Sequence, residues 1–122
     1  MHLGQTTPIL RSFDEAKARE FYLGYLGFQL LFEHRFEPGL PLYMGIVRDG
    51  CTLHLSEHHG DASPGAAMRI EVDDIDALQA ELAARPYRHA RPEVQLQPWG
   101  TRDMTLVDPF GNRLTFTSAI SV

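Results

Sequence analysis

"QPWGTRDMTLVDPFGNRLTF", residues 97–116, contains the local signals that decide the fold. Its turn-forming residues from Pro109 to Asn112 separate two segments that alternate between apolar and polar side chains, and this pattern predicts a β-hairpin. Trp99, the only tryptophan of the chain, precedes the hairpin between a proline and a glycine. Those flanks indicate a loop or a strand edge for Trp99, although a large aromatic side chain normally packs in a core.

Upstream of this stretch, a helix is predicted over residues 14–26. Ser12, with Glu15 three residues later, forms a capping-box pattern in which each side chain satisfies a free backbone N–H of the first turn. Apolar residues then recur at helical spacing along one stripe: Ala18, Phe21, Tyr22, Tyr25 and Leu26. Gly27 is placed to end the helix in the left-handed conformation.

A second helix is predicted to start near Asp73 or Asp74. Its apolar face consists of Ile75, Leu78, Leu82 and Ala83. Arg85-Pro86 ends this helix, because a residue before proline is displaced from helical geometry.

Elsewhere the hydrophobic pattern has a period of two, which predicts strands that bury one side and expose the other. The residues that share one side of a predicted strand are Phe28, Leu30, Phe32, His34 and Phe36; Cys51, Leu53 and Leu55; Met68, Ile70 and Val72; and Leu114, Phe116 and Ser118. Asp49-Gly50 predicts a tight hairpin between two of the strands.

The order of the elements repeats along the chain. A strand over 7–10, a helix and three strands fill residues 7–57, and the same order returns from Ala67. The two hairpin turns lie about sixty positions apart, a spacing that indicates two copies of one β-α-β-β-β unit. By its length of 122 residues the chain forms one domain. We expect a first module over about 1–58, a linker over 59–65 and a second module over 66–122.

Composition narrows the class of protein. Hydrophobic residues make up 43% of the chain and charged residues 22%, which is ordinary for a globular protein. The net charge of −5 disfavours nucleic acid as a partner and favours cationic small molecules. No apolar run could span a bilayer and the N-terminal residues lack signal-peptide features, so a cytoplasmic protein without a membrane partner is expected. Cys51, the single cysteine, excludes an internal disulfide and a thiolate metal cluster.

Four segments together resemble the bleomycin-resistance proteins of the glyoxalase, or vicinal oxygen chelate (VOC), superfamily: "FYLGYLGF" (21–28), "GIVRDGCTLHLSEH" (45–58), "EVDDIDAL" (71–78) and residues 97–116. Pro-Trp-Gly followed by Asp-Pro-x-Gly-Asn is the most specific part. The resemblance implies an α+β fold of tandem βαβββ modules that form curved mixed sheets. It also implies a homodimer with two ligand grooves at the subunit interface.

The superfamily also contains metal enzymes, whose ligands are His and Glu or Gln side chains from four strands. The matching positions here are approximately Thr7, His54, Ala67 and Thr115, of which only His54 ligates a metal well. A shift of one residue on a strand offers Glu71 but does not restore the set. The resemblance therefore implies no metal, no other cofactor and no catalytic residue.

The candidate ligand-binding residues come from both sources. Trp99 matches the family tryptophan that stacks on the flat bithiazole rings of the drug. Tyr43 lies where related binding proteins carry a groove aromatic, with packing on a strand neighbour as the alternative. Strand alternation adds the polar candidates His54, Ser56, Arg69 and Glu71. For His54 the alternative is a cleft histidine without a role, and for Arg69 it is a structural ion pair.

Two other groups of residues are predicted to have no chemical role. His58, His59 and Asp61 fall in or beside the linker, where a solvated segment is expected rather than a metal site. Cys51 alternates with apolar positions and is predicted to be a small core residue.

The sequence thus favours a non-catalytic protein that binds and sequesters a planar, cationic antibiotic such as bleomycin and so gives drug resistance. The alternative is a divalent-metal-dependent VOC enzyme, of the glyoxalase, dioxygenase or fosfomycin-resistance type, that acts on a small electrophile. That enzyme needs two more metal ligands than the sequence offers. A superfamily member with an unrelated small-molecule ligand is a third possibility.

Overall fold

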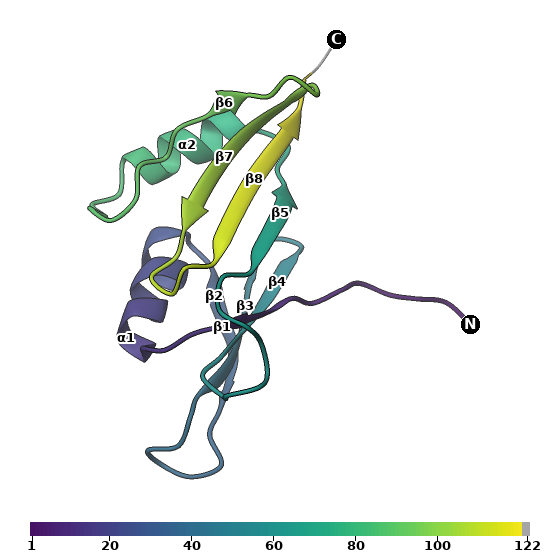
Figure 1. Ribbon diagram of the computed structural model, residues 1–122. Helices are drawn as coiled ribbons and strands as arrows, with labels where there is room; N and C mark the ends of the chain where they lie inside the picture. The colour runs from purple at the N-terminus through teal and green to yellow at the C-terminus, as the bar shows by residue number, and fades with distance from the viewer. Residues whose placement is uncertain (121–122) are drawn as a thin grey trace. The chain divides into compact units, whose positions relative to one another are not determined.

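The computed structural model describes residues 1–120 and divides into two compact units, Met1–Pro64 and Gly65–Val122 (Figure 1). The elements of the first unit are β1 (Ile9–Arg11), α1 (Glu15–Ala18), the π-helix η1 (Arg19–Tyr25), β2 (Gln29–His34), β3 (Tyr43–Arg48) and β4 (Cys51–Ser56). Its sheet has the order β1-β4-β3-β2. β1 pairs with β4 in parallel, and the other neighbours are antiparallel.

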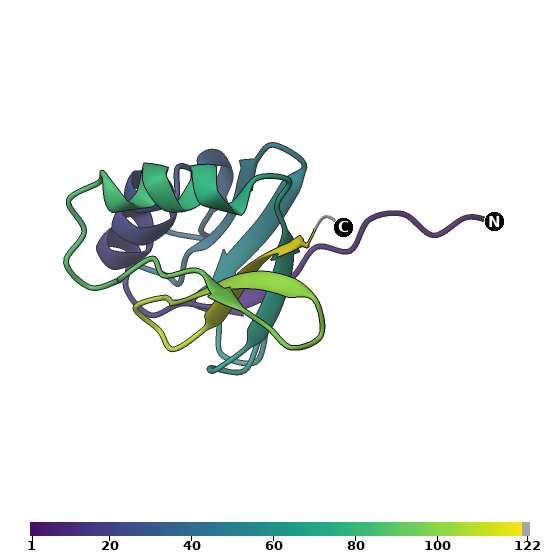
Figure 2. The same cartoon turned by 90° about the horizontal axis from the view of Figure 1, so that it is seen from above.

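The second unit repeats this topology. Its elements are β5 (Ala67–Glu71), α2 (Ile75–Ala83), β6 (Gln95–Leu96), β7 (Thr101–Val107) and β8 (Arg113–Ala119). The sheet order is β5-β8-β7-β6, again with one parallel pair, β5 with β8. Figure 2 shows α2 running along one side of this sheet. The predicted α+β fold of two βαβββ units is therefore confirmed, although the first strand runs over Ile9–Arg11 rather than 7–10.

Aspartates cap both helices. The Asp14 carboxylate accepts a hydrogen bond from the Lys17 N–H at 2.9 Å, and Asp74 does the same for Ala77 at 3.0 Å. The predicted capping box was therefore wrong in naming Ser12 as the cap. Ser12 instead extends the β1–β4 pairing, because its buried backbone N–H donates to the Ser56 carbonyl.

The first helix also differs in its winding. After one turn of α-helix, Arg19–Tyr25 forms a π-helix, and the Leu26 N–H donates to the carbonyl of Phe21, five residues back. The predicted apolar stripe is buried as expected, with Phe21 and Tyr22 meeting edge to face at 4.8 Å. Gly27 ends the helix at φ 75°, the predicted left-handed conformation.

The core follows the predicted alternation on the inner strands. Buried apolar side chains in the first unit include Leu10, Met44, Ile46, Leu53 and Leu55, and in the second Met104, Leu106, Leu114, Phe116 and, from α2, Ile75, Leu78 and Leu82. Cys51 is half-buried, as are Met68 and Ile70. Ala83 was wrongly placed on the buried face of the second helix and is exposed near its end.

β2 departs from the predicted pattern. All six of its residues are exposed, and its register with β3 shifts between Leu30 and Phe32. Leu30 lies opposite Ile46, whereas Phe32 lies opposite Gly45. Because neighbouring residues of a strand point to opposite faces, this bulge at Leu31 moves Phe32 to the face opposite that of Leu30. The prediction of one continuous side from Phe28 to Phe36 was wrong for that reason.

No helix within the described residues is long and apolar enough to cross a membrane.

Candidate functional site

Three aromatic rings from three neighbouring strands meet on one face of the first sheet. Phe32 of β2 and Tyr43 of β3 lie nearly parallel, at 13° with ring centroids 6.2 Å apart. His54 of β4 meets Phe32 edge-on at 5.2 Å and Tyr43 edge-on at 5.3 Å. We call Phe32, Tyr43 and His54 the aromatic cluster.

A glycine makes room for the aromatic cluster. Gly45 lies between Phe32 and His54 in the register of β2, β3 and β4. A Cβ atom at Gly45 would lie 2.3 Å from Cε1 of Phe32, so the ring covers the bare backbone. Glycine inside a strand commonly marks such a close approach. Sequence reasoning missed Phe32 as a site residue, and Gly45 among the apolar residues in the middle of β3 was the signal that could have found it.

Tyr43 and His54 are also joined by a hydrogen bond. The Tyr43 hydroxyl lies 2.7 Å from Nδ1 of His54. Burial raises the pKa of the Tyr43 phenol, and the negative charge of Asp61 raises it further. The phenol of Tyr43 therefore keeps its proton at neutral pH. The structure thus brings Tyr43 and His54, two of the predicted site residues, into direct contact.

Ser56 is placed differently from His54. It is fully buried, its hydroxyl donates to Oδ2 of Asp61 at 2.7 Å, and the His58 N–H donates to the same hydroxyl at 3.1 Å. These bonds fasten the start of the segment after β4. A ligand contact at Ser56 stays a prediction, and it would require this local pairing to open.

Trp99 lies at the tip of the β6–β7 hairpin. The Gly100 N–H donates to the Gln97 carbonyl at 3.1 Å, and the Gln97 N–H donates to the Thr101 carbonyl at 2.7 Å. With Gly100 at φ 98°, this is a three-residue hairpin loop whose last residue is left-handed. Proline in the first loop position and glycine in the third both suit this turn. The Trp99 side chain is left 66% exposed, as its flanks predicted.

Arg69 is held on the open face of the second sheet by a buried carboxylate. Both guanidinium NH groups donate to Asp103 at 3.2 Å, and Thr117 donates to the same carboxylate at 2.6 Å. Burial alone would raise the pKa of Asp103, but the hydrogen bonds from Thr117 and Arg69 outweigh it and hold the pKa below its usual value. The structural ion pair proposed as an alternative for Arg69 is present. Its partner, Asp103, was not anticipated.

Glu71, the remaining candidate, is exposed at the end of β5, opposite Thr117 in the register. Its carboxylate makes no ion pair among the described residues, which suits attraction of a cation.

Of the four positions that match metal ligands, only His54 carries a side chain that ligates a metal well. Ile9, not Thr7, pairs with His54, and Thr7 precedes β1. In the second unit Ala67 has no ligating atom, and the Thr115 hydroxyl is bonded to Thr105 at 2.9 Å. Within residues 1–120, no group of three His, Cys, Asp or Glu side chains could hold a metal ion.

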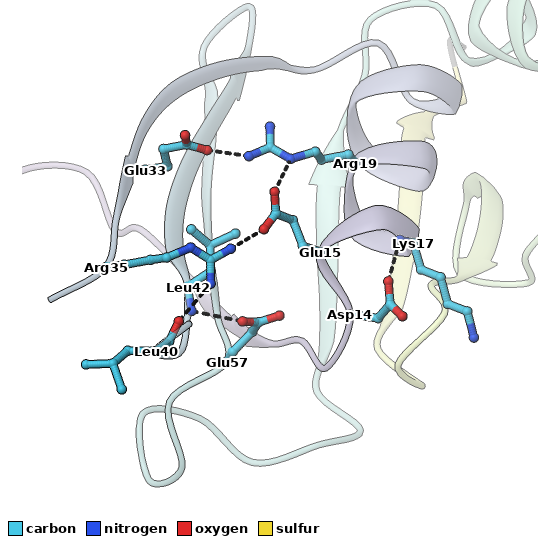
Figure 3. A network of polar contacts seen from close by, with 9 residues as sticks. All are labelled: Asp14, Glu15, Lys17, Arg19, Glu33, Arg35, Leu40, Leu42 and Glu57. Carbon is cyan, nitrogen blue, oxygen red and sulfur yellow. Dashed lines mark hydrogen bonds and ion pairs between the residues drawn. The ribbon is translucent and has the colours of Figure 1, made fainter. Parts of the chain in front are cut away.

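A network of charged residues joins β2 and Arg35, which follows it, to α1 and η1 (Figure 3). Arg19 bonds to both Glu15 and Glu33, and Arg35 bonds to Glu15 and to the Leu40 carbonyl. A shallow hollow of about 290 Å³ lies beside it, lined by Ser12, Phe13, Arg35, Gly39, Leu40, Pro41 and Glu57. Pockets for drug-sized ligands measure roughly 300–1,000 Å³, and the charged groups of this hollow already bind the chain itself. The aromatic cluster and Trp99 are therefore the better candidates.

A family model described as "Glyoxalase superfamily protein" matches residues 1–121. Among solved structures, the bleomycin-binding protein of bleomycin-producing Streptomyces verticillus, complexed with copper(II)-bleomycin, is 30% identical, with a TM-score of 0.73 over 98% of each chain. Another bleomycin-binding protein, complexed with bleomycin, is 26% identical, with a TM-score of 0.70 over 95% of this chain and 98% of that chain. TnmS3, an antibiotic binding protein from Streptomyces sp. CB03234, is 24% identical, with a TM-score of 0.73 over 98% of each chain. No curated protein sequence matches this chain.

Proposed function

We propose that this chain, which belongs to the glyoxalase superfamily, binds a planar, cationic antibiotic such as bleomycin and releases it chemically unchanged. Binding alone would confer resistance, because a sequestered drug molecule is kept from its target. The observation that carries the proposal is the exposed Trp99 ring on a short, hydrogen-bonded turn. An exposed indole on a rigid turn offers its face to a flat ring system and loses little conformational freedom on binding.

The comparisons support this ligand class. Two similar structures are of proteins that bind bleomycin, one of them with its copper(II) complex, and both align over nearly their whole length. The net charge of −5 favours a cationic ligand, and Glu71 is an exposed carboxylate available to attract a cationic tail.

We place the binding groove at the interface of a homodimer. β2 exposes three consecutive apolar side chains, Leu30, Leu31 and Phe32, at the edge of its sheet. An exposed apolar strand edge of this kind is a pairing hazard unless another chain covers it. A second copy would cover it and would turn open sheet faces into a groove that buries most of a ligand.

Fluorescence titration tests the proposal directly, because the emission comes from one tryptophan. We expect saturable quenching of Trp99 by metal-free and by copper-loaded bleomycin, and recovery of unmodified drug after denaturation of the complex. Leu96→Ala, which trims another exposed apolar side chain next to the same hairpin loop, serves as the matched control and should leave the affinity close to that of the wild type. Absence of saturation, or a metal-dependent chemical change in the drug, would refute the proposal; the second result would favour the enzyme alternative.

A further inference from the structure

The hydrogen bond between Tyr43 and His54 determines which nitrogen of the imidazole carries a proton. A neutral histidine has one N–H and one acceptor nitrogen, and the partner of one nitrogen fixes the role of the other. Nδ1 of His54 lies 2.7 Å from the Tyr43 hydroxyl. The distance fits either direction, and we assign the hydroxyl as the donor and Nδ1 of His54 as the acceptor because a phenol O–H donates more strongly than its oxygen accepts.

The proton of a neutral His54 therefore lies on Nε2. Among residues 1–120, Nε2 of His54 has no hydrogen-bond partner, and the ring is half-buried beside the exposed face of Phe32. A half-buried N–H donor without a protein partner can donate a hydrogen bond to an acceptor atom of a ligand. Flat rings on the same face provide the adjoining apolar contact.

We propose that Tyr43 is a positioning residue that holds His54 as an Nε2–H donor, so that the aromatic cluster binds the edge of a planar heteroaromatic ligand through a neutral acceptor. The acceptor is a ring nitrogen or a carbonyl oxygen. This inference rests on the proposed function, since it assigns the ligand chemistry recognised by that binding surface. It adds Phe32 as a contact and gives Tyr43 a role through His54 rather than through ring contact alone.

The surrounding charges favour a neutral acceptor over an anionic one. A neutral imidazole N–H supplies no positive charge, and the Asp61 carboxylate is close enough to raise the pKa of Tyr43. An anionic group at this surface would meet the negative field of Asp61, whereas a neutral acceptor would not be repelled by it.

Quinoline and naphthalene provide a matched pair of probes. They have nearly the same flat area, and only quinoline carries an acceptor nitrogen. A neutral hydrogen bond contributes about 0.5–1.5 kcal/mol, so quinoline should bind wild-type protein roughly two- to tenfold more tightly than naphthalene. Long-range ¹⁵N–¹H correlation spectra of the six histidines, with His54→Phe to assign the resonance, should show His54 protonated at Nε2.

Tyr43→Phe removes the hydroxyl and keeps the ring. We expect it to populate the other tautomer of His54 and to bring the two affinities close to equality, while naphthalene binding changes little. Tyr87→Phe, a hydroxyl deletion in the second unit, is the control and should keep the preference. Melting curves verify that both variants fold.

Three results would overturn the inference: a wild-type His54 protonated at Nδ1, equal affinities for the two probes, or no binding of either. Failure of the proposed function can be told apart from failure of this inference. If bleomycin does not bind while the quinoline preference is present and depends on Tyr43, the ligand chemistry assigned here stands and the antibiotic does not.

Discussion

The Phe32 ring occupies the space that a side chain at Gly45 would fill. The two residues are register partners on β2 and β3, and a Cβ at Gly45 would overlap the ring at 2.3 Å from Cε1. A strand with no side chain at this point lets the ring lie flat beside Tyr43 and His54. The aromatic cluster therefore depends on a glycine that makes no polar contact of its own.

Gly45→Ala is expected to displace the Phe32 ring and weaken ligand binding several-fold. Overpacking a core typically costs about 1–3 kcal/mol. The free energy of unfolding should fall by less than that here, because Phe32 is an exposed side chain that can move aside. Isothermal calorimetry with bleomycin and a thermal melt measure the two effects. In a Phe32→Ala background the same glycine substitution should have almost no further effect on affinity, since the clash is gone. Additive losses would contradict the relationship.

Asp103 should make stability depend on pH in the acid range. Its pKa in the folded protein lies below the unfolded value of about 4, so its contribution is fully present above pH ~4 and is lost as the pH falls through the lower folded pKa. Urea unfolding between pH 7 and the acid limit measures this loss. Asp103→Asn should lower stability at neutral pH, because it leaves Arg69 without its charged partner, and should flatten the acid part of the profile. A profile unchanged in Asp103→Asn would show that other carboxylates dominate.

The two adjacent aspartates before α2, Asp73 and Asp74, should contribute different amounts to the free energy of unfolding. Only Asp74 accepts a hydrogen bond from the backbone of the first turn, from Ala77 at 3.0 Å. Asp74→Ala should cost about 1 kcal/mol of stability, the usual value of an N-cap. Asp73→Ala removes the same charge one residue earlier and should change stability by much less. Equal losses in chemical denaturation would mean that charge near the helix start, rather than the cap, is responsible.

Exposed apolar side chains at the edge of β2 should support self-association. We expect the wild-type chain to sediment as a dimer at tens of micromolar, roughly where an interface of standard size is populated. Leu31→Glu places a charge on the bulge and should shift the protein to the 13.8 kDa monomer while its circular dichroism spectrum stays that of the wild type, because Leu31 is already exposed within the single chain. A wild-type chain that sediments only as a monomer would contradict the dimer and the interfacial groove with it.

Local signals predicted the repeated architecture, because hairpin turns are set by neighbours in sequence. Asp49-Gly50 and the Pro109–Asn112 segment both form hairpin turns, with Asp49 itself at φ 51°. The bulge at Leu31 could not be predicted, because it depends on which residues of β3 pair with β2 rather than on the β2 sequence. An ion pair of Arg69 was predicted, but its partner Asp103 was missed for the same reason, because it lies 34 positions away. Of the site, exposure of Trp99 could be predicted from its proline and glycine flanks, whereas the Tyr43–His54 bond required the register of two strands.

Trp99→Ala distinguishes a binding role from a packing role. A core tryptophan would cost about 3–5 kcal/mol on truncation, enough to unfold a marginal domain. Trp99 is 66% exposed and its turn is held by backbone hydrogen bonds, so we expect the melting temperature to stay near the wild-type value. Bleomycin affinity should fall about tenfold or more, since stacking beyond area burial contributes on the order of 1 kcal/mol and burial of the ring adds to it.

Calorimetry must replace fluorescence for this variant, because the substitution removes the only tryptophan. Gly100→Ala is the informative companion: it keeps the indole but strains a backbone at φ 98°, so it should lower stability and disturb the direction in which Trp99 points. Weakened binding in both variants, with a normal melting temperature only in Trp99→Ala, would mean that the indole ring contacts the ligand and that the turn sets the orientation of the ring. A large drop in the melting temperature of Trp99→Ala would make the residue structural, and a normal melt with unchanged affinity would leave the indole outside the binding surface.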